Sequence, residues 1–289
     1  MGLRTQMTDR LAMRALKTLP KNLVSRAFGV ISEVELPTPV QGGVNRGFAS
    51  LYGLNVDESE HPPEHYQSLN AFFTRHLKKG ARTIFQVEPG TLYSPVDGRI
   101  TQFDSVSSGA LVQAKGRNYR LVDLVDSAEE AARFESGSYA TIYLSPKDYH
   151  RIHAPVSGVV RKISYIPGQL WPVNPLSVRN VDRLFAINER LIVYLDHEEL
   201  GSIAVIMVGA TCVGRIGLAF DELTSNQSWR RRQERTLVDP ITLNAADELG
   251  VFNLGSTVIL LVENEEFAWR GDLIDGQGIR LGDELGSLS

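Results

Sequence analysis

The sequence predicts an α+β protein with a mainly antiparallel β body, arranged as a sandwich or barrel, beneath an N-terminal helical cap. From about residue 91, short runs of β-branched and aromatic residues alternate with Gly, Pro, Asn and Asp. This alternation is typical of short strands joined by turns. Before residue 91, apolar residues recur at helical spacing instead. We therefore expect a helical region over residues 1–90 and a β-rich region over residues 91–289.

Residues 8–32 predict two short helices that are separated at Pro20. One face of these helices is apolar, and a neighbouring face carries Arg10, Arg14, Lys17 and Lys21. Such a helix suits adsorption to an anionic bilayer, at roughly 1 kcal/mol per basic residue near the headgroups. A helix that packs on the protein body and leaves its basic edge in solvent explains the same pattern.

The remaining elements follow in chain order. Residues 37–65 are rich in Pro and Gly and predict turns, whereas residues 68–79 predict a helix that carries Phe72 and Phe73. The arginine-rich run 229–235 predicts an exposed loop or short helix. The clearest strand predictions are residues 139–144, 158–166, 190–195, 202–208 and 257–262.

Composition excludes several classes of protein. The chain has 289 residues, 22% of them charged, and a net charge of -4, which argues against nucleic-acid binding. Six basic residues and one acid give residues 1–32 a charge of +5, which leaves -9 for the rest. The lone Cys212 excludes an intramolecular disulfide and a multi-cysteine metal site. No apolar run of about 18 residues predicts a membrane span, and no secretory signal is evident, so we expect a cytoplasmic location.

The Gly255-Ser256 bond is the most reactive feature that the sequence suggests. It lies where a turn enters the apolar run 257–262, so the serine hydroxyl stands at the start of a buried strand. The missing side chain of Gly255 leaves its carbonyl open to attack. Attack by Ser256 would convert the amide into an ester, and elimination would then cut the chain and leave a pyruvoyl group. An ordinary Gly-Ser turn accounts for the same four residues, 254–257.

An attacking serine needs a base and an acid that orients the base. His150 and His153 are three residues apart after the strand predicted at 139–144, so both could line one pocket. Asp97 is the candidate acid, although an Asp-Gly hairpin turn also explains it. A zinc site that uses His150 and His153 with a distant aspartate is a rival interpretation, but no third histidine or suitably placed glutamate accompanies the pair. Spacing alone does not decide between these alternatives.

A set of separated motifs resembles the phosphatidylserine decarboxylase proenzymes of prokaryotic type. These motifs span roughly residues 68–262 in the order of that family. They are the segments 70–75, 94–98, 145–155, 168–175, 184–190, 208–211 and 254–257. Asn253 departs from the family pattern, where lysine is common, as does Trp171-Pro172, where phenylalanine and serine are usual.

The resemblance implies a proenzyme that cleaves itself at Gly255-Ser256 and then converts phosphatidylserine into phosphatidylethanolamine and CO2. Asp97 would orient His153, and His153 would take the proton of Ser256. The products would be a β chain, 1–255, and an α chain, 256–289, that stay associated. Residue 256 would become the pyruvoyl cofactor, which forms a Schiff base with the substrate amine. His150 would contact the substrate carboxylate or transfer a proton, and no metal is implied.

The resemblance also favours the membrane interpretation of the N-terminus. Phosphatidylserine lies in an anionic bilayer, so we expect a peripheral protein at the cytoplasmic face of the cell membrane, docked through residues 1–90 with Phe72 and Phe73. A homodimer is one alternative for the oligomeric state. Two other functions stay open: a pyruvoyl decarboxylase of a soluble aromatic amino acid, and a zinc hydrolase that uses His150 and His153.

Overall fold

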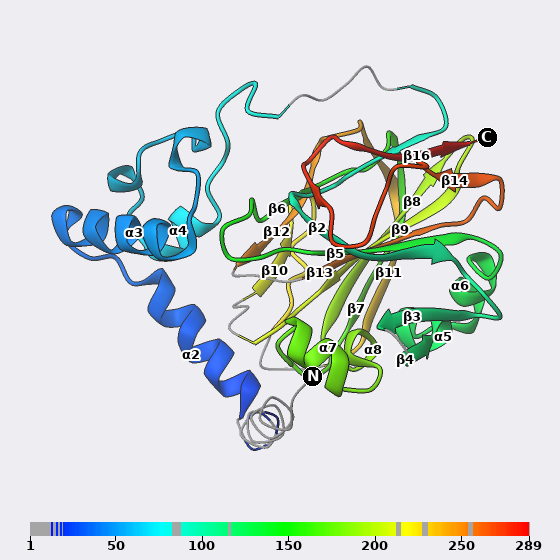
Figure 1. The fold of residues 1–289 in the computed structure, drawn as a ribbon, viewed down its shortest axis with the longest axis horizontal. Helices are drawn as coiled ribbons and strands as arrows, with labels where there is room; N and C mark the ends of the chain where they lie inside the picture. Colours follow the sequence, from blue (N-terminus) through cyan, green and yellow to red (C-terminus); the bar gives the residue numbers. More distant parts are fainter. Residues whose placement is uncertain are drawn as a thin grey trace.

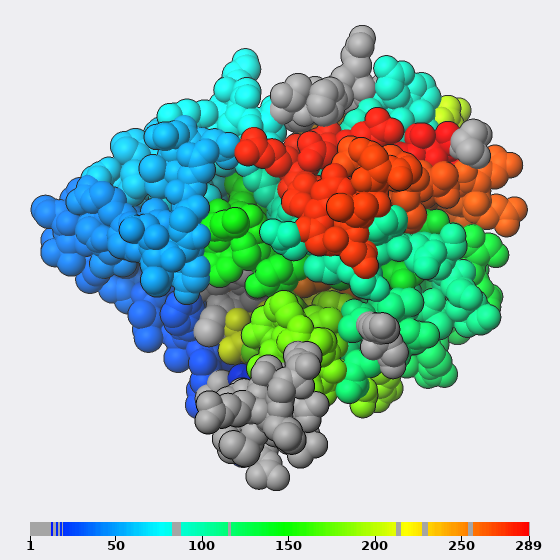
Figure 2. Space-filling view, in the orientation of Figure 1, coloured from blue at the N-terminus to red at the C-terminus, as the bar shows by residue number. Residues whose placement is uncertain are grey.

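The computed structural model describes residues 13, 16, 18, 20–82, 88–114, 117–211, 215–226, 231–253 and 257–288. A helical region from the N-terminal part of the chain lies beside a larger β body, as the ribbon shows (Figure 1). The space-filling view shows the blue helical region in contact with the green and cyan parts of the β body (Figure 2). This arrangement confirms the predicted α+β class with a mainly antiparallel β body.

The helical region begins with α2 (Lys21–Glu33) directly after Pro20, which stands at the N-cap of the helix. The predicted break at Pro20 therefore agrees with the structure, because proline is tolerated at a helix start and not in its interior. Most of the first predicted helix, including Arg10, Arg14 and Lys17, lies outside the described residues.

The turns predicted over residues 37–65 are wrong for half of that stretch, where helix α3 (Thr38–Tyr52) forms. Pro39 lies in the first turn of α3, where a missing backbone N–H costs nothing. Gly53 ends the helix in the left-handed conformation, with φ of 71°. A Cβ atom added at Gly42 would approach Glu64 Cγ to 3.0 Å, so the glycine permits close packing of α3 on the following loop. Two short 3-10 turns follow, η1 (Val56–Glu58) and η2 (Pro63–His65).

The helix predicted over residues 68–79 is shorter in the structure, where α4 covers Leu69–Phe73. Ser68 caps it, since its side chain accepts a hydrogen bond from the backbone N–H of Ala71 at 3.0 Å. Phe72 and Phe73 are only 0% and 1% exposed. The prediction that they dock on the membrane is therefore wrong, because they pack inside the protein.

The β body is built on an eight-stranded sheet in the order β11-β7-β8-β9-β13-β5-β2-β15. Every adjacent pair in this sheet is antiparallel. Its strands are β11 (Gln233–Leu243), β7 (Gly158–Ile166), β8 (Arg190–His197), β9 (Gly201–Val208), β13 (Thr257–Val262), β5 (Ser138–Tyr143), β2 (Gly98–Ser105) and β15 (Gly278–Ile279). The predicted strands at 158–166 and 257–262 match β7 and β13 residue for residue.

Three smaller sheets and four short helices complete the body. The sheets have the orders β1-β16-β14, β10-β12-β6 and β3-β4. Their strands are β1 (Thr91–Tyr93), β16 (Glu284–Leu288), β14 (Phe267–Trp269), β10 (Arg215–Leu218), β12 (Glu248–Asn253), β6 (Arg151–His153), β3 (Ala110–Ala114) and β4 (Arg117–Arg120). The helices are α5 (Leu121–Val125), α6 (Ala128–Arg133), α7 (Pro175–Asn180) and α8 (Leu184–Ile187).

The prediction of a loop or short helix over 229–235 is wrong at its C-terminal end. Residues 233–235 begin the edge strand β11 and pair with β7. Charged side chains such as Glu234 and Arg235 are tolerated there because an edge strand faces solvent, and charges on an edge discourage pairing with another chain. Among the helices in the described residues, none is both long and apolar enough to cross a membrane.

Candidate functional site

The Gly255-Ser256 bond belongs to the connection between β12 and β13, and residues 254–256 lie outside the described residues. The two flanking strands are described. β12 belongs to the small sheet beside β6 and β10, and β13 lies in the middle of the large sheet between β9 and β5. Thr257, the first residue of β13, is paired with Tyr143 and Val208. The connection therefore leads from the strand that adjoins the histidine segment into the core of the large sheet.

His150 lies directly against the end of β12, since the backbone N–H of Phe252 donates to the His150 carbonyl at 2.9 Å. Its ring is fully buried and contacts the Phe73 ring, with centroids 4.0 Å apart. Nδ1 of His150 is 2.8 Å from the Asp148 carbonyl, so this nitrogen carries the proton and donates it. Nε2 is buried and has no hydrogen-bond partner among the described residues.

The electrostatic environment keeps His150 uncharged. The pKa of its imidazole is lowered to about 3, chiefly by burial; the hydrogen bond to the Asp148 carbonyl raises it and the positive charge of Arg75 lowers it. The ring is therefore neutral near pH 7, with a lone pair on Nε2. A buried nitrogen with an unused lone pair is the form that a proton acceptor requires.

His153 lies in β6, which is paired with β12. Both nitrogens of its ring have a hydrogen-bond partner, whereas only one nitrogen of His150 does. Nδ1 donates to the Ala246 carbonyl at 2.7 Å, and Nε2 is 3.2 Å from the Tyr149 hydroxyl, which can donate to it. Burial is the largest cause that lowers the pKa of His153. The salt bridge between Arg151 and Glu248, at 2.6 Å, holds β6 to β12 next to this ring.

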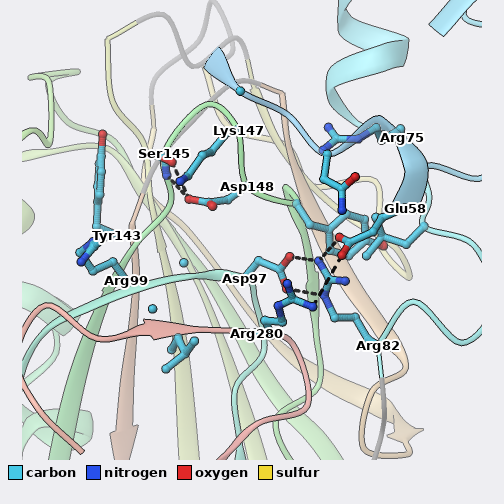
Figure 3. Close-up of a pocket in the computed structure, with 17 residues that line it drawn as sticks. Glu58, Arg75, Arg82, Asp97, Arg99, Tyr143, Ser145, Lys147, Asp148 and Arg280 are labelled. Atoms are coloured by element: carbon cyan, nitrogen blue, oxygen red, sulfur yellow. Dashed lines mark hydrogen bonds and ion pairs between the residues drawn. The ribbon is translucent and has the colours of Figure 1, made fainter. Parts of the chain in front are cut away.

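Asp97 stands between β1 and β2, at the edge of a polar cavity of about 600 Å³ (Figure 3). Its Oδ1 accepts hydrogen bonds from Arg82 Nε at 2.8 Å and from the Leu281 backbone N–H at 2.9 Å. Arg82 also pairs with Asp97 Oδ2 and, at 2.9 Å, with Glu58. Burial disfavours the charged guanidinium, but the hydrogen bonds and charges of Asp97 and Glu58 raise the pKa of Arg82 overall.

The structure brings His150 and His153 together beside β12 but does not join Asp97 to either histidine. Among the described residues, no hydrogen bond links Asp97 to His153. Tyr149 contacts His153 and lines the same cavity as Asp97. The Asp97–His153 pair therefore stays a prediction, as does the role of Ser256.

Two residues near the predicted site were missed by the sequence interpretation. Arg82 pairs with Asp97 from 15 positions away, in a stretch with no motif of its own. Tyr149 was inside the histidine motif but carried no distinct signal there. Neither contact follows from local spacing, because both depend on how separate segments pack.

The arrangement offers no support for a zinc site. Within the described ranges, no group of three or more His, Cys, Asp and Glu side chains could hold a metal ion. The two ring nitrogens of His153 and Nδ1 of His150 are already taken by protein groups.

Lys21 is not exposed at the surface, where a residue that binds lipid headgroups would have to lie. Its side chain is buried, and its ammonium group lies 3.7 Å from the centroid of the Trp171 ring. Burial lowers the pKa of Lys21. This residue joins α2 to the β body through a cation–π contact, so its inclusion in a membrane-facing basic surface is wrong.

Comparison with known proteins assigns the chain to a class of decarboxylases. The sequence profile of the phosphatidylserine decarboxylase family matches residues 69–287. The chain belongs to this family.

The most informative relatives match it from end to end. A phosphatidylserine decarboxylase proenzyme of Myxococcus xanthus is 42% identical over 283 residues, which cover 98% of this chain and 100% of the relative. The proenzyme of an Anaeromyxobacter species is 44% identical over 286 residues, with the same coverage. That of Brevibacillus brevis is 38% identical over 280 residues, which cover 96% of this chain and 98% of the relative.

Proposed function

We propose that this chain is a proenzyme that cleaves itself at Gly255-Ser256 and then decarboxylates phosphatidylserine to phosphatidylethanolamine and CO2. The observation that carries the proposal is the buried, neutral His150, whose backbone lies against the end of β12, next to the Gly255-Ser256 connection. His153 follows in β6, opposite Glu248 at the start of β12. Family membership supports the reaction. The comparisons give no support to a soluble amino-acid substrate or to a zinc hydrolase.

In the processing step, the Ser256 hydroxyl attacks the Gly255 carbonyl and loses its proton to a histidine. We assign this proton to His153, with Asp97 as the acid that stabilises the charged ring. Tyr149 would have to release Nε2 of His153, because its hydroxyl now occupies that nitrogen at 3.2 Å. Elimination of the ester then releases the Gly255 carboxylate and leaves dehydroalanine at position 256. The imine tautomer of that residue takes up water and loses ammonia, so that a pyruvoyl group begins the α chain.

In the decarboxylation step, the pyruvoyl group at position 256 supplies the electron sink that takes up the electrons of the broken C–CO2 bond. The residues present fit such a group, because the orphaned Nε2 belongs to His150, whose backbone lies against the end of β12, the strand that precedes position 256. Nε2 of His150 would take a proton from the bound amine and return it to the carbon that has lost CO2. The buried side chains of Phe73 and Phe252 are apolar, and they keep water away from the site of this proton transfer.

The substrate is a membrane lipid, and we propose that α2 and α3 hold the enzyme on the cytoplasmic face of the membrane as a peripheral protein. Twelve large apolar side chains are exposed among the described residues, and nine of them lie between residues 23 and 52. They are Leu23, Val30, Ile31, Val34, Leu36, Val40, Val44, Leu51 and Tyr52. A concentration of exposed apolar surface on two amphipathic helices is typical of interfacial binding.

The test of the proposed function is the Ser256→Ala variant, with the wild-type chain as its control. The wild-type protein should show two chains by intact mass, split at Gly255-Ser256, and should release CO2 from phosphatidylserine. Ser256→Ala should stay at full length and lose activity by at least about 10⁴-fold, since both the nucleophile and the electron sink are gone. Cleavage of the variant at the same bond would contradict the proposed self-processing.

A further inference from the structure

A second pocket, of about 230 Å³, lies between α2 and the end of β12. Its polar lining comprises Arg26, Ser32, Glu33, Asn70, Arg215, Asn226 and Asn253. We propose that this pocket binds the phosphodiester of the phosphatidylserine substrate, with Arg26 and Arg215 as the cationic groups. The inference rests on the proposed function, because it assigns the substrate headgroup to a subsite of that enzyme.

The pocket is tied to the strand that precedes the reactive position. Asn253, the last residue of β12, accepts a hydrogen bond from Asn70 Nδ2 at 3.0 Å and donates one to the Arg215 carbonyl at 3.0 Å. Three residues of chain span at most about 11 Å, so the wall of the pocket is within reach of position 256. The phosphorus and the amine of phosphatidylserine are only a few bonds apart. A phosphodiester in the pocket therefore leaves the amine near position 256.

The charges of the pocket suit an anion with several oxygen atoms. The lining residues include two arginines, Arg26 and Arg215, and one acid, Glu33, so their net charge is positive. Nε of Arg26 donates to Asn226 Oδ1 at 3.3 Å, which orients the planar guanidinium. A guanidinium presents parallel N–H donors that match two oxygens of a phosphate, and this geometry makes arginine a common phosphate ligand.

The pocket also adjoins the apolar surface on which a lipid would lie. Val30 lines the pocket and is 68% exposed, and Leu23 and Ile31 on the same helix are each 66% exposed. Residues 23, 27, 30 and 31 share one face of α2, while residues 26 and 33 lie on the neighbouring face. A lipid whose acyl chains contact the first face therefore presents its headgroup to the second. Free phosphate could satisfy the charges alone, but it would make no use of this apolar face.

Kinetics on a soluble substrate test the assignment without the contribution of membrane binding. The variants are Arg26→Gln and Arg215→Gln, and the control is Arg120→Gln, which removes the same charge at an exposed site on β4. With dihexanoyl phosphatidylserine below its micelle concentration, each pocket variant should raise KM about tenfold or more, the loss expected for a charged hydrogen bond. The kcat should stay within about twofold and the control should be unchanged. Arg26→Lys should restore part of the affinity.

Binding of a lipid that cannot react provides a readout besides activity. Dihexanoyl phosphatidylglycerol has the phosphodiester and no amine, and calorimetry should show that both pocket variants bind it more weakly than wild type. Dihexanoylglycerol, which lacks the phosphate, should bind all variants alike. Unchanged KM in both variants, an equal rise in Arg120→Gln, or equal binding of inorganic phosphate would each overturn the headgroup assignment. If wild type binds phosphatidylglycerol through the two arginines but releases no CO2 from phosphatidylserine, the pocket stands and the proposed function fails.

Discussion

His150 and His153 are three residues apart in the sequence, yet their imidazoles have different hydrogen-bond partners. His153 uses both ring nitrogens, one with Ala246 and one with Tyr149. His150 uses only Nδ1, and its Nε2 is buried without a partner among the described residues. An unpaired buried nitrogen costs stability, typically about 1–3 kcal/mol, so its persistence in a packed site is consistent with use in the reaction. The two rings are therefore suited to separate steps.

At the residue scale, we predict that processing and decarboxylation separate by mutation. His153→Ala and Asp97→Asn should slow self-cleavage by about 10²–10⁴-fold, because the serine hydroxyl is a poor nucleophile without an oriented base. His150→Ala should still cleave, but its CO2 release should fall by about 10²-fold or more. Intact mass measures cleavage, and CO2 release from the processed fraction measures decarboxylation.

His65→Gln is the control, since this histidine on η2 is exposed and lies outside the histidine motif. The opposite pattern, in which His150→Ala stays uncleaved and His153→Ala matures normally, would reverse the roles assigned to the two rings.

The helices carry side chains that pack on the protein body and others that face solvent, and the sequence pattern does not distinguish the two sets. Lys21 and the phenylalanines of α4 face inward, where they fasten the helical region to the β body and to His150. Leu23, Val30 and Ile31 of α2 face outward. The exposed apolar surface that we propose docks on the membrane therefore differs from the basic face predicted from Arg10, Arg14, Lys17 and Lys21. Of these four residues, only Lys21 is described, and it is buried.

At the element scale, we predict that membrane binding depends on the exposed apolar face of α2. The Leu23→Ser, Ile31→Ser double variant should bind vesicles of phosphatidylserine and phosphatidylglycerol at least about tenfold more weakly, since each large apolar side chain contributes about 1.5–3 kcal/mol when it is buried. Co-sedimentation measures the binding. Thermal unfolding should be unchanged, because both side chains are exposed.

The matched control is Val238→Ser with Ile274→Ser, which removes two exposed apolar side chains far from α2 in the sequence. Equal loss of vesicle binding in this control, or full binding by the α2 variant, would show that α2 does not dock on the membrane.

At the scale of the whole molecule, cleavage at residue 255 would cut the chain next to the centre of the large sheet. β13 begins immediately after the cut and is hydrogen-bonded to β5 on one side and β9 on the other. All six of its residues are at most 1% exposed. The later strands β15 and β16 pair with β2 and β1, so the proposed α chain is interleaved with the proposed β chain. Burial of the five aliphatic side chains of β13 alone contributes on the order of 10 kcal/mol.

We therefore predict that the two chains stay together after processing. Size-exclusion chromatography under native conditions should give one peak at the elution volume of the uncleaved Ser256→Ala variant. Mass spectrometry of that peak should find both chains, and 1 M salt should not separate them, because the contact is apolar and hydrogen-bonded. Recovery of the α chain alone without denaturant would contradict this prediction.

Local composition and short motifs were enough to predict several features of this protein. The apolar runs at 158–166 and 257–262 form strands with the predicted bounds, Pro20 separates the N-terminal helix predictions, and the separated motifs identify the family. Tertiary structure alone decided which side chains face solvent and which pair across the fold. It placed Phe72, Phe73 and Lys21 inside and brought Arg82 to Asp97 and Tyr149 to His153. It also formed α3 from a segment rich in glycine and proline. These outcomes depend on contacts between segments that are distant in the chain, and the free energy of such contacts overrides local propensity.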